Sequence, residues 1–405
     1  MRVLYTFIVR LYAGIVHIAA LFGNKKAKQW RKGRENQWGR LSGKDLSGQW
    51  LWVHVASLGE FEQGLPVIEA LKKKYPEYKM LLTFFSPSGY EVKKDFPLAD
   101  IVAYLPVDTR GNAARLVRKF NIKAAFFVKN EFWYNYIKTL KDNDIPLYYL
   151  SISLRKNQAL LRLRWFRRHL SCVEYFFAQD ENTAALLRTN NINKVTVTGD
   201  TRFDRVYSIA QTAPRYPEVE RFIDGRKCII AGSSWPSDER LLYPFIENMP
   251  DDYCFIMVPH DISEQHIKQI ESELHDYQLY TELTDKHSKV LVVNTIGILS
   301  KLYQYARFAY IGAGFYNGIH NIQEAVVYGV PVVFGPKYHD YIEAVELIAL
   351  KGAFVINNRA ELENVFSTFI NDESFFDSAS QVCKDYVASK IGATDMIMKV
   401  LESEL

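Results

Sequence analysis

The sequence has few cysteines and no metal-binding pattern. Its 405 residues include only four cysteines, which are far apart, and it has no CxxC pair and no His/Cys cluster. Such spacing argues against a metal site. Cys228 and Cys254 lie in apolar runs typical of strands, where we expect buried core thiols. The pattern fits a reducing environment such as the cytosolic face of a membrane.

The sequence also lacks a strong charge imbalance, repeats and low-complexity tracts. The formal net charge is only +4, so the chain has no global signature of nucleic-acid binding and we expect no nucleic-acid partner. A hydrophobic content of 48% and a charged content of 24% are those of a globular protein. A chain of 405 residues is too long for one ordinary core, which predicts two domains.

One long apolar run is present, from Leu4 to Phe22. As a helix it would be about 28 Å long, close to the thickness of a bilayer core. Arg10 lies near its middle, and a central arginine costs about 2.5–3.5 kcal/mol on insertion. The more polar positions of the run fall on one helical face: Thr6, Arg10, Gly14 and His17. A helix that lies in the membrane interface therefore competes with one that spans the bilayer.

A basic block follows the apolar run and contains one acidic residue, Glu35. Its cations are Lys25, Lys26, Lys28, Arg31, Lys32, Arg34 and Arg40. Such a block stays cytoplasmic and favours an anionic membrane surface. No cleavage signature follows the apolar run, so we interpret residues 1–40 as a membrane anchor with a basic linker, not a removed signal peptide. The alternative is a solvated basic linker behind a buried helix.

From Gln49 onward, short apolar strands alternate with helical periodicity, which predicts an α/β fold with parallel sheets. The predicted strands are Trp50–Val55, Met80–Phe85, Ala124–Val128, Leu147–Ile152, Tyr175–Ala178, Lys227–Ala231, Tyr253–Val258, Val290–Val293, Phe308–Ile311 and Pro331–Phe334. The rhythm breaks in the polar stretch 201–225. We therefore predict one Rossmann-like domain over residues 41–205, a second over 206–385, and a C-terminal helix over 386–405 that packs back across the junction.

The stretch from Ile311 to Tyr341 reads as a strand, a glycine-rich turn, a helix and another strand. Gly312, Gly314 and Gly318 would let the backbone turn tightly and approach a ligand. The helix is expected to begin near His320-Asn321 with Glu324 in its first turn. A helix N-terminus binds anions, and a carboxylate there can accept hydrogen bonds from a ribose diol. The second turn, Gly335-Pro336-Lys337, favours a nucleotide-sugar site over a simple capped turn.

Glu60 is the candidate general base. The segment Ser57–Glu60 follows the first predicted strand and opens a helix. Ser-x-x-Glu in this position is also a capping box, with Ser57 as N-cap. Ligands bind at such strand ends in open α/β sheets, and a helix N-terminus would keep Glu60 ionised, as a base requires. Both interpretations stay open at this point.

Two cations and a histidine are further candidates. Lys129 opens the segment Lys129–Asn135 directly after a predicted strand, which suggests the wall of a cleft or a surface loop. Arg202 lies at the domain junction and could reach a phosphate or sugar carboxylate, or pair with Asp200 or Asp204. His260 follows another strand, although a lone histidine is more often structural.

Nine segments, in this order, resemble the bacterial 3-deoxy-D-manno-octulosonic acid (Kdo) transferases of lipid A biosynthesis. They are Ser57–Glu60, Ser86–Gly89, Leu105–Asp108, Glu131–Trp133, Thr198–Asp204, Val258-Pro259, Gly312–Gly314, His320-Asn321 with Glu324, and Gly335-Pro336. The apolar N-terminal segment also matches, so the resemblance spans nearly the whole chain.

The resemblance implies a GT-B fold of two Rossmann-like domains facing a cleft, attached to the cytoplasmic face of the inner membrane. It implies CMP-Kdo as donor substrate, a lipid A precursor as acceptor, and neither a metal nor a separate cofactor. Glu60 would be the base, and Lys129 and Arg202 would stabilise the transition state. The implied CMP contacts are Pro259, His260, Ile296, Gly297, Ile298, Asn321, Ile322, Gln323 and Glu324.

The chain departs from the family pattern in four places, which indicates a divergent branch. Where the family commonly has E-x-E-L-W-P-N, S-T-H-E-G-E, P-R-H and M-G-E-L, this chain has Lys129–Asn135, Ser233–Asp238, Pro259–Asp261 and Ile296–Leu299. These changes put donor contacts in doubt more than the reaction. Two alternatives remain: another GT-B enzyme that uses a UDP-sugar for a lipid-linked acceptor, and a membrane-tethered scaffold without activity.

Overall fold

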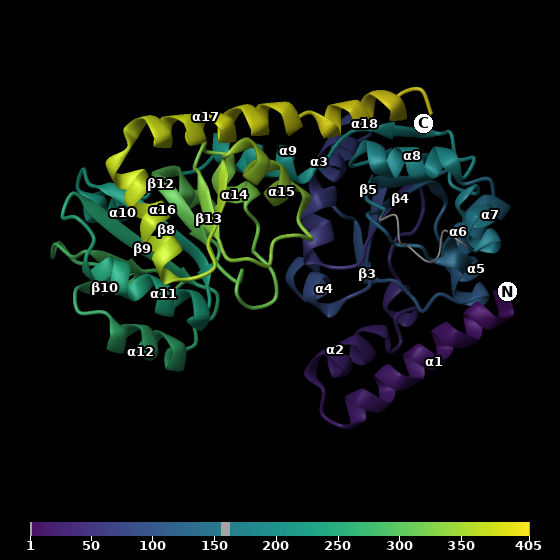
Figure 1. Cartoon of the computed structure of the whole chain (residues 1–405). Coiled ribbons are helices and arrows are strands. Elements are labelled where there is room, and N and C mark those ends of the chain that lie inside the picture. The colour runs from purple at the N-terminus through teal and green to yellow at the C-terminus, as the bar shows by residue number, and fades with distance from the viewer. Residues whose placement is uncertain (1, 155–162, 405) are drawn as a thin grey trace. The chain divides into compact units, whose positions relative to one another are not determined.

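The computed structural model describes residues 2–154 and 163–404 (Figure 1). The chain forms two compact units. Unit 1 comprises Met1–Arg205 and Gly392–Leu405, and unit 2 comprises Val206–Ile391. Each unit has its own sheet and core and is described separately below.

Unit 1 contains a seven-stranded parallel sheet in the order β3-β2-β1-β4-β5-β6-β7. The strands are β1 (Trp50–Val55), β2 (Lys79–Phe84), β3 (Ile101–Tyr104), β4 (Ile122–Val128), β5 (Leu147–Ile152), β6 (Tyr175–Ala178) and β7 (Val195–Val197). Its helices include α3 (Leu58–Lys74), α4 (Pro87–Lys93), α5 (Arg110–Lys119), α6 (Tyr134–Asp142), α7 (Arg164–Leu170), α8 (Glu181–Thr189) and the start of α9 (Arg202–Gln211). The chain order reverses between β1 and β4, which makes this edge a topological switch point.

The apolar strands predicted from the sequence form the centre of this sheet because they are buried on both faces. All six residues of β1 are buried, including Trp50, Trp52 and the polar His54. One core contains Trp50 and Trp52, and the other, on the opposite face, contains Leu51 and Val53. Because β1 and β4 are buried and paired, the loops that follow their carboxyl ends are held next to each other.

Unit 2 repeats this plan with the order β10-β11-β9-β8-β12-β13-β14. The strands are β8 (Lys227–Ser234), β9 (Tyr253–Pro259), β10 (Tyr277–Leu279), β11 (Val290–Val292), β12 (Ala306–Ile311), β13 (Val332–Phe334) and β14 (Ala353–Val355). The helices are α10 (Pro217–Ile223), α11 (Pro236–Glu247), α12 (Glu264–Glu273), α13 (Leu299–Leu302), α14 (Gln323–Val326), α15 (Ile342–Leu350), α16 (Arg359–Asn371) and α17 (Glu373–Lys390). Here the switch point lies between β8 and β12.

The N-terminal segment forms two helices that lie side by side, α1 (Arg2–Leu21) and α2 (Lys25–Arg34) (Figure 1). Near the start of α1, Tyr5 Oη donates a hydrogen bond to Asp108 Oδ2 at 2.7 Å, and Asn135 Nδ2 donates to Thr6 Oγ1 at 3.3 Å. Near its end, the His17 ring lies 5.9 Å from the ring of Trp30 in α2. The helix is therefore held to the rest of unit 1 near both ends.

The basic block predicted as a linker is in fact helical over Lys25–Arg34 and packs on α4. Arg34 points inward, where it donates to Leu105 O at 3.1 Å and Phe85 O at 2.8 Å and lies 4.0 Å from the centre of the Trp30 ring. Burial lowers the pKa of Arg34 to about 9, so it stays charged at neutral pH. Arg34 is thus a structural cation and does not face lipid.

The chain returns to unit 1 at its C-terminus. The sequence predicted a C-terminal helix over 386–405, whereas α17 ends at Lys390 and α18 spans Ala393–Leu401. Ile397 and Leu401 join the core beside α3, and the Asp204 carboxylate accepts the backbone N–H groups of Gly392 and Thr394. Short 3₁₀ turns occur at Gly39–Leu41, Tyr280–Glu282 and Tyr303–Tyr305.

Candidate active site

The carboxyl ends of β1 and β4 bring the candidate base and its charged neighbours together in unit 1. Glu60 lies in the first turn of α3, directly after β1, while Lys129 and Glu131 directly follow β4. Because β1 and β4 are adjacent parallel strands, these segments meet at one edge of the sheet. This is the switch point of unit 1, where ligands bind in open α/β sheets.

Glu60 does not form the predicted capping box. Ser57 is the N-cap of α3, but its side chain makes no capping hydrogen bond. The Glu60 carboxylate instead accepts the backbone N–H of Ala56 at 2.5 Å. The helix start is therefore stabilised by Glu60 itself and not by a reciprocal pair.

The pKa of Glu60 is raised to about 7, first by burial and then by the negative charge of Glu131. The Ala56 and Ser57 backbone and the charge of Lys129 oppose this rise. The expectation that the helix N-terminus keeps Glu60 fully ionised is wrong, because burial outweighs the helix N-terminus. A carboxyl group with a pKa near 7 matches the requirement for a general base at neutral pH.

Glu131 belongs to a hydrogen-bonded cluster with Trp133 and His54. The Trp133 Nε1–H lies 2.7 Å from Glu131 Oε2 and 3.0 Å from His54 Nε2. His54 is fully buried, and its Nδ1 lies 2.9 Å from Thr83 Oγ1. The cluster fixes the Glu131 carboxylate close enough to influence Glu60. No chemical role was predicted for Glu131, Trp133 or His54, although the Glu131–Trp133 segment matches the family pattern and could have indicated two of them.

Lys129 adopts a left-handed backbone conformation with φ of 64°, which is uncommon for a residue other than glycine. Its backbone N–H donates to Leu150 O at 2.8 Å, so the chain turns away immediately after β4. The charge of Lys129 lowers the pKa of Glu60, so the structure brings these two predicted residues together.

Arg202 pairs with Asp200, one of the two alternatives that the sequence left open. Its Nε and Nη2 lie 2.8 and 2.6 Å from Asp200 Oδ2. Gln63 of α3 donates to the other oxygen of Asp200 at 2.8 Å. Arg202 is therefore linked through Asp200 to the helix that carries Glu60. A phosphate bound by Arg202 would have to share the guanidinium group with the Asp200 carboxylate.

In unit 2, four rings lie one against the next around the switch point. His260, which follows Pro259 at the end of β9, stacks on Trp235 and on His320, in each case at 4.7 Å between ring centres. Tyr316 stacks on Trp235 at 4.7 Å, and Trp235 Nε1 donates to His320 Nε2 at 3.1 Å. Burial and the charge of His260 lower the pKa of His320 to about 4, so this ring is neutral at neutral pH.

Asp238 holds this ring stack against the β12 turn. It is fully buried and accepts three hydrogen bonds, from Trp235 N at 2.9 Å, Ala313 N at 2.8 Å and Tyr310 Oη at 2.8 Å. Burial raises its pKa. Trp235 and Asp238 occupy positions where the family pattern has other residues, and neither was predicted to belong to the site.

The predicted helix behind the glycine turn is shorter than expected. It is the single turn α14, which starts at Gln323 and carries Glu324 in that turn. Asn321 Oδ1 accepts Gln323 N–H at 3.0 Å, and Asn321 Nδ2 donates to Glu324 Oε1 at 3.2 Å. Ile322 is the N-cap of α14 and has no side-chain capping bond. The helix thus begins just after the expected start near His320-Asn321 and carries Glu324 in its first turn, as predicted. Asn321 and Glu324 form the polar part of this turn.

Gly312 and Gly314 permit contact between backbone segments, which differs from the expected approach to a ligand. A Cβ on Gly312 would lie 2.1 Å from Ser233 O, and one on Gly314 would lie 2.5 Å from Gly335 N. The Gly314 and Gly335 turns therefore pack directly on each other. Gly318, with φ of +116°, makes the tight turn itself.

The turn Ile296-Gly297-Ile298 is exposed at its tip. Ile296 is 81% exposed, and Gly297 has a positive φ of 95°. Ile298 then begins α13, which packs on α14. Over residues 2–154 and 163–404, no group of three or more His, Cys, Asp or Glu side chains is arranged to hold a metal ion.

Comparison with known proteins finds similar sequences of one kind. Residues 24–205 match the family model described as 3-deoxy-D-manno-octulosonic-acid transferase (kdotransferase). The chain is 26% identical over 341 residues to the 3-deoxy-D-manno-octulosonic acid transferase of Chlamydophila psittaci, covering 80% of this chain and 78% of the relative. It is 27% identical over 321 residues to that of Aquifex aeolicus, covering 77% and 83%. These similarities over most of the chain support a Kdo transferase.

The fold agrees with this assignment. UDP-GlcNAc 2-epimerase from Neisseria meningitidis, solved with UDP-GlcNAc, superposes with a TM-score of 0.64 at 16% identity, over 88% of this chain and 100% of that one. The predicted GT-B class of two Rossmann-like domains is confirmed. The match to the Kdo transferase model ends at Arg205, where unit 1 ends, and begins after α1. It therefore includes Glu60, Lys129 and Arg202.

Proposed function

We propose that this Kdo transferase moves Kdo from CMP-Kdo to a lipid A precursor in lipopolysaccharide biosynthesis. The observation that supports this most directly is Glu60, a partly buried carboxyl group with a pKa of about 7 at the switch point of unit 1, in a chain similar to Kdo transferases. A group with this pKa can both accept and release a proton at neutral pH.

In the proposed reaction, Glu60 takes the proton of the acceptor hydroxyl as that oxygen bonds to the anomeric carbon of Kdo. The bond between this carbon and the phosphate oxygen breaks, and CMP leaves with the electron pair. Lys129 and Arg202 offset negative charge on the departing phosphate or on the Kdo carboxylate. The Lys129 cation lies close enough to Glu60 to lower its pKa, so both side chains can act on one bound substrate.

We place the donor in unit 2, on the residues around Asn321 and Glu324. The Asn321 amide donates to Glu324 Oε1 at 3.2 Å, and a carboxylate in this position suits the hydroxyl groups of a ribose. His320 and His260 continue the polar edge of this site, and the exposed Ile296–Ile298 turn is the remaining predicted contact. No separate cofactor is required in this proposal, because CMP-Kdo itself carries the leaving group.

We propose that α1 attaches the protein to the cytoplasmic face of the inner membrane by lying in the membrane interface. Val3–Leu21 is long and apolar enough to cross a bilayer, with a mean hydropathy of 1.7, and little of it is buried. Its exposed apolar side chains are Val3, Leu4, Phe7, Ile8, Leu11, Tyr12, Ile15, Ile18 and Leu21. Because Tyr5 and His17 contact the rest of unit 1 near the two ends, a spanning helix would have to break both attachments.

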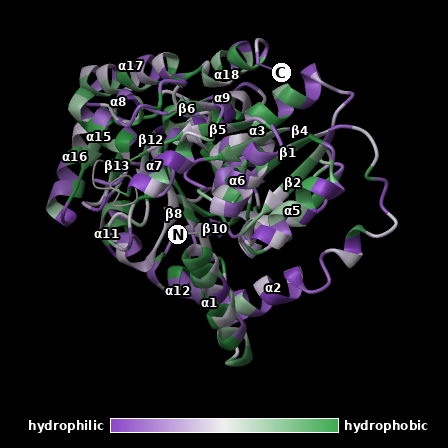
Figure 2. Ribbon diagram, turned by 90° about the vertical axis from the view of Figure 1, so that its right-hand side faces the viewer, coloured by the Kyte–Doolittle hydropathy of each residue, from purple (hydrophilic) through white to green (hydrophobic). Residues whose placement is uncertain are grey.

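The exposed lysines of α2 support the same orientation. Lys25, Lys26, Lys28 and Lys32 face solvent beside the apolar helix, whereas Arg34 does not. Figure 2 shows α1 largely hydrophobic and α2 largely hydrophilic. Such a pair suits an anionic bilayer, with the apolar face in the acyl region and the lysines at the head groups.

The decisive test is turnover of CMP-Kdo by the full-length protein with a detergent-dispersed lipid A precursor. We expect a Kdo-modified lipid and free CMP in equal amounts. The same assay with UDP-sugars separates this function from that of another lipid-linked glycosyltransferase. Binding of CMP without any turnover would identify a scaffold and contradict the proposal.

A further inference from the structure

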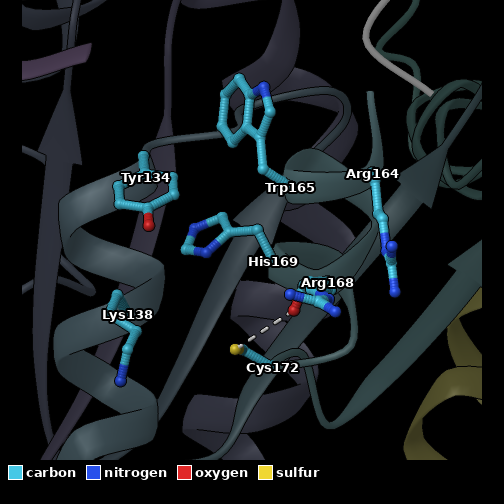
Figure 3. A pocket seen from close by; sticks show the side chains of 7 residues that line it. All are labelled: Tyr134, Lys138, Arg164, Trp165, Arg168, His169 and Cys172. Atoms are coloured by element: carbon cyan, nitrogen blue, oxygen red, sulfur yellow. Dashed lines mark hydrogen bonds between the residues drawn. The ribbon is translucent and has the colours of Figure 1, made fainter. Parts of the chain in front are cut away.

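A cavity lies between α6 and α7 of unit 1, and Glu60 is not among the residues that line it. Its volume is about 540 Å³, which is enough for a lipid head group. Figure 3 shows Tyr134 and Lys138 of α6 facing Trp165 and His169 of α7. The described residues that line it are Tyr134, Lys138, Arg164, Trp165, Arg168, His169 and Cys172.

The lining is positively charged. The described residues of the lining include Lys138, Arg164 and Arg168, and none of them carries a carboxylate. Lys138 forms an ion pair with Asp142, one turn further along α6. Arg164 and Arg168 are four residues apart on α7, where like charges repel each other across one helical face. Such a pair is stabilised by an anion with several acceptor oxygens, and arginine is suited to phosphate in particular.

The remaining lining is aromatic. The Tyr134 ring stacks on His169 at 4.1 Å between ring centres and lies 5.7 Å from that of Trp165. The buried Trp165 Nε1 has no hydrogen-bond partner among the described residues. Aromatic rings with a polar tip are typical of the membrane–water interface, where the apolar body and the polar group meet different surroundings.

Tyr134 also connects the cavity to the membrane helix and to the site of the base. Its ring lies 5.3 Å from that of Tyr5 in α1, and its backbone N–H donates to Tyr5 Oη at 3.4 Å. The preceding residue, Trp133, donates to Glu131. The cavity thus adjoins both the helix that we place in the interface and the Glu131 cluster.

We propose that this cavity binds the phosphate of a membrane lipid head group, with Arg164 and Arg168 as its principal ligands. The phosphate belongs either to the acceptor or to a surrounding anionic phospholipid, and both present the same chemistry. The proposal rests on the membrane attachment proposed above, but the binding itself does not require Kdo transfer.

Cys172 offers a test in the unmodified protein, because it lines the cavity and is half-buried, whereas Cys228, Cys254 and Cys383 are buried. Short-chain phosphatidic acid, added as a soluble probe, should slow alkylation of Cys172 by N-ethylmaleimide by about tenfold or more at saturation. Short-chain phosphatidylcholine, which has no net charge, should protect much less. Equal alkylation rates with and without phosphatidic acid would overturn the proposal.

Substitution provides the second measurement. The double variant Arg164→Gln with Arg168→Gln should weaken calorimetric binding of phosphatidic acid by about tenfold or more, since each lost contact is a charge-assisted hydrogen bond. The matched control is Arg221→Gln with Arg240→Gln, two exposed arginines of unit 2 with the same change in net charge. Equal weakening in the control would show a general charge effect and reject the site.

Two further arms identify the source of the phosphate. If the acceptor supplies it, the Arg164/Arg168 variant should raise KM for a phosphorylated acceptor in detergent with little change in kcat. If a phospholipid supplies it, KM should stay unchanged while binding to phosphatidylglycerol vesicles falls. If phosphatidic acid does not protect Cys172 in the unmodified protein, the cavity proposal is refuted even where transfer occurs. Protection without transfer refutes only the proposed reaction.

Discussion

The pKa of Glu60 depends on a small number of named neighbours. Burial and Glu131 favour the protonated form, whereas Lys129 and the Ala56 and Ser57 backbone favour the carboxylate. These groups come from three places in the chain: the end of β1, the start of α3 and the loop after β4. The acid–base behaviour of one residue is therefore set by the packing of two adjacent strands.

Glu60→Gln should lower kcat by about 10²–10⁴-fold, because the amide can still accept the Ala56 N–H but cannot take a proton. For the wild type, kcat/KM should rise with pH and level off above about pH 7, since the base must be ionised. Because the folded-state pKa is raised, the protein loses stability as pH rises through about 7, and Gln should remove that loss. Near wild-type turnover in the Gln variant would mean that Glu60 only holds the helix start.

Glu131→Gln should shift the pH–rate profile to lower pH, because it removes a negative charge that raises the pKa of Glu60. At about pH 6, well below the wild-type midpoint, the relative rate should rise about threefold if positioning is kept. Lys129→Gln is the opposite-sign control and should shift the profile to higher pH. Profiles that do not move in either variant would show that these charges do not act on the base.

Among individual residues, the sequence could predict those that follow a strand and open a turn, such as Glu60 and Lys129. It could not predict the contact of His54 with Glu131, because these residues are 77 positions apart and meet only when β1 pairs with β4. Trp235 was missed for a related reason. Its indole contacts three rings from other segments of the chain, those of His260, Tyr316 and His320, and the family pattern has no tryptophan at this position.

At the scale of elements, the apolar central strands were predictable, but the short edge strands were not. The missed strands β3, β7, β10 and β14 lie at the edges of their sheets and have only one or two buried residues each, whereas all three residues of β11 and of β13, which were predicted, are buried. The helix α2 was missed because its many lysines and arginines suggested a solvated linker. Asn24 accepts the Ala27 N–H at 3.0 Å and was the capping signal that could have revealed it.

The apolar face of α1 can be tested without deleting the helix. Replacing Phe7, Leu11 and Ile15 with Gln should reduce vesicle binding of the full-length protein by more than about tenfold, since each exposed side chain contributes apolar area to the interface. The fold should persist, because Tyr5 and Thr6 keep their contacts. The matched control replaces Ile342, Val345 and Leu350, which are exposed on α15 of unit 2, with Gln. Unchanged flotation of the α1 variant would contradict membrane attachment through this face.

At the scale of the whole molecule, the chain contains the same sheet topology twice. Each unit has a parallel sheet with a topological switch point, between β1 and β4 in unit 1 and between β8 and β12 in unit 2. The alternation of strands and helices was sufficient to predict this class. In the structure, the Asp204 carboxylate accepts the backbone N–H groups of Gly392 and Thr394 where the chain returns to unit 1. No local pattern predicts this particular contact, because its partners are far apart in the sequence.

If unit 2 binds the donor, CMP should protect it selectively. At a concentration one hundred times Kd, a ligand adds about 2.7 kcal/mol of stability, which corresponds to a rise in Tm of about 5–10 °C for a unit of this size. Hydrogen exchange should slow within Val206–Ile391, around Asn321–Glu324 and the start of α11, and much less within unit 1. Glu324→Gln should reduce both effects, whereas Glu264→Gln, an exposed carboxylate on α12, should not. Equal stabilisation by UDP and CMP would instead favour a UDP-sugar donor. Protection confined to unit 1 would show that the nucleotide binds unit 1 and would contradict the assignment to unit 2.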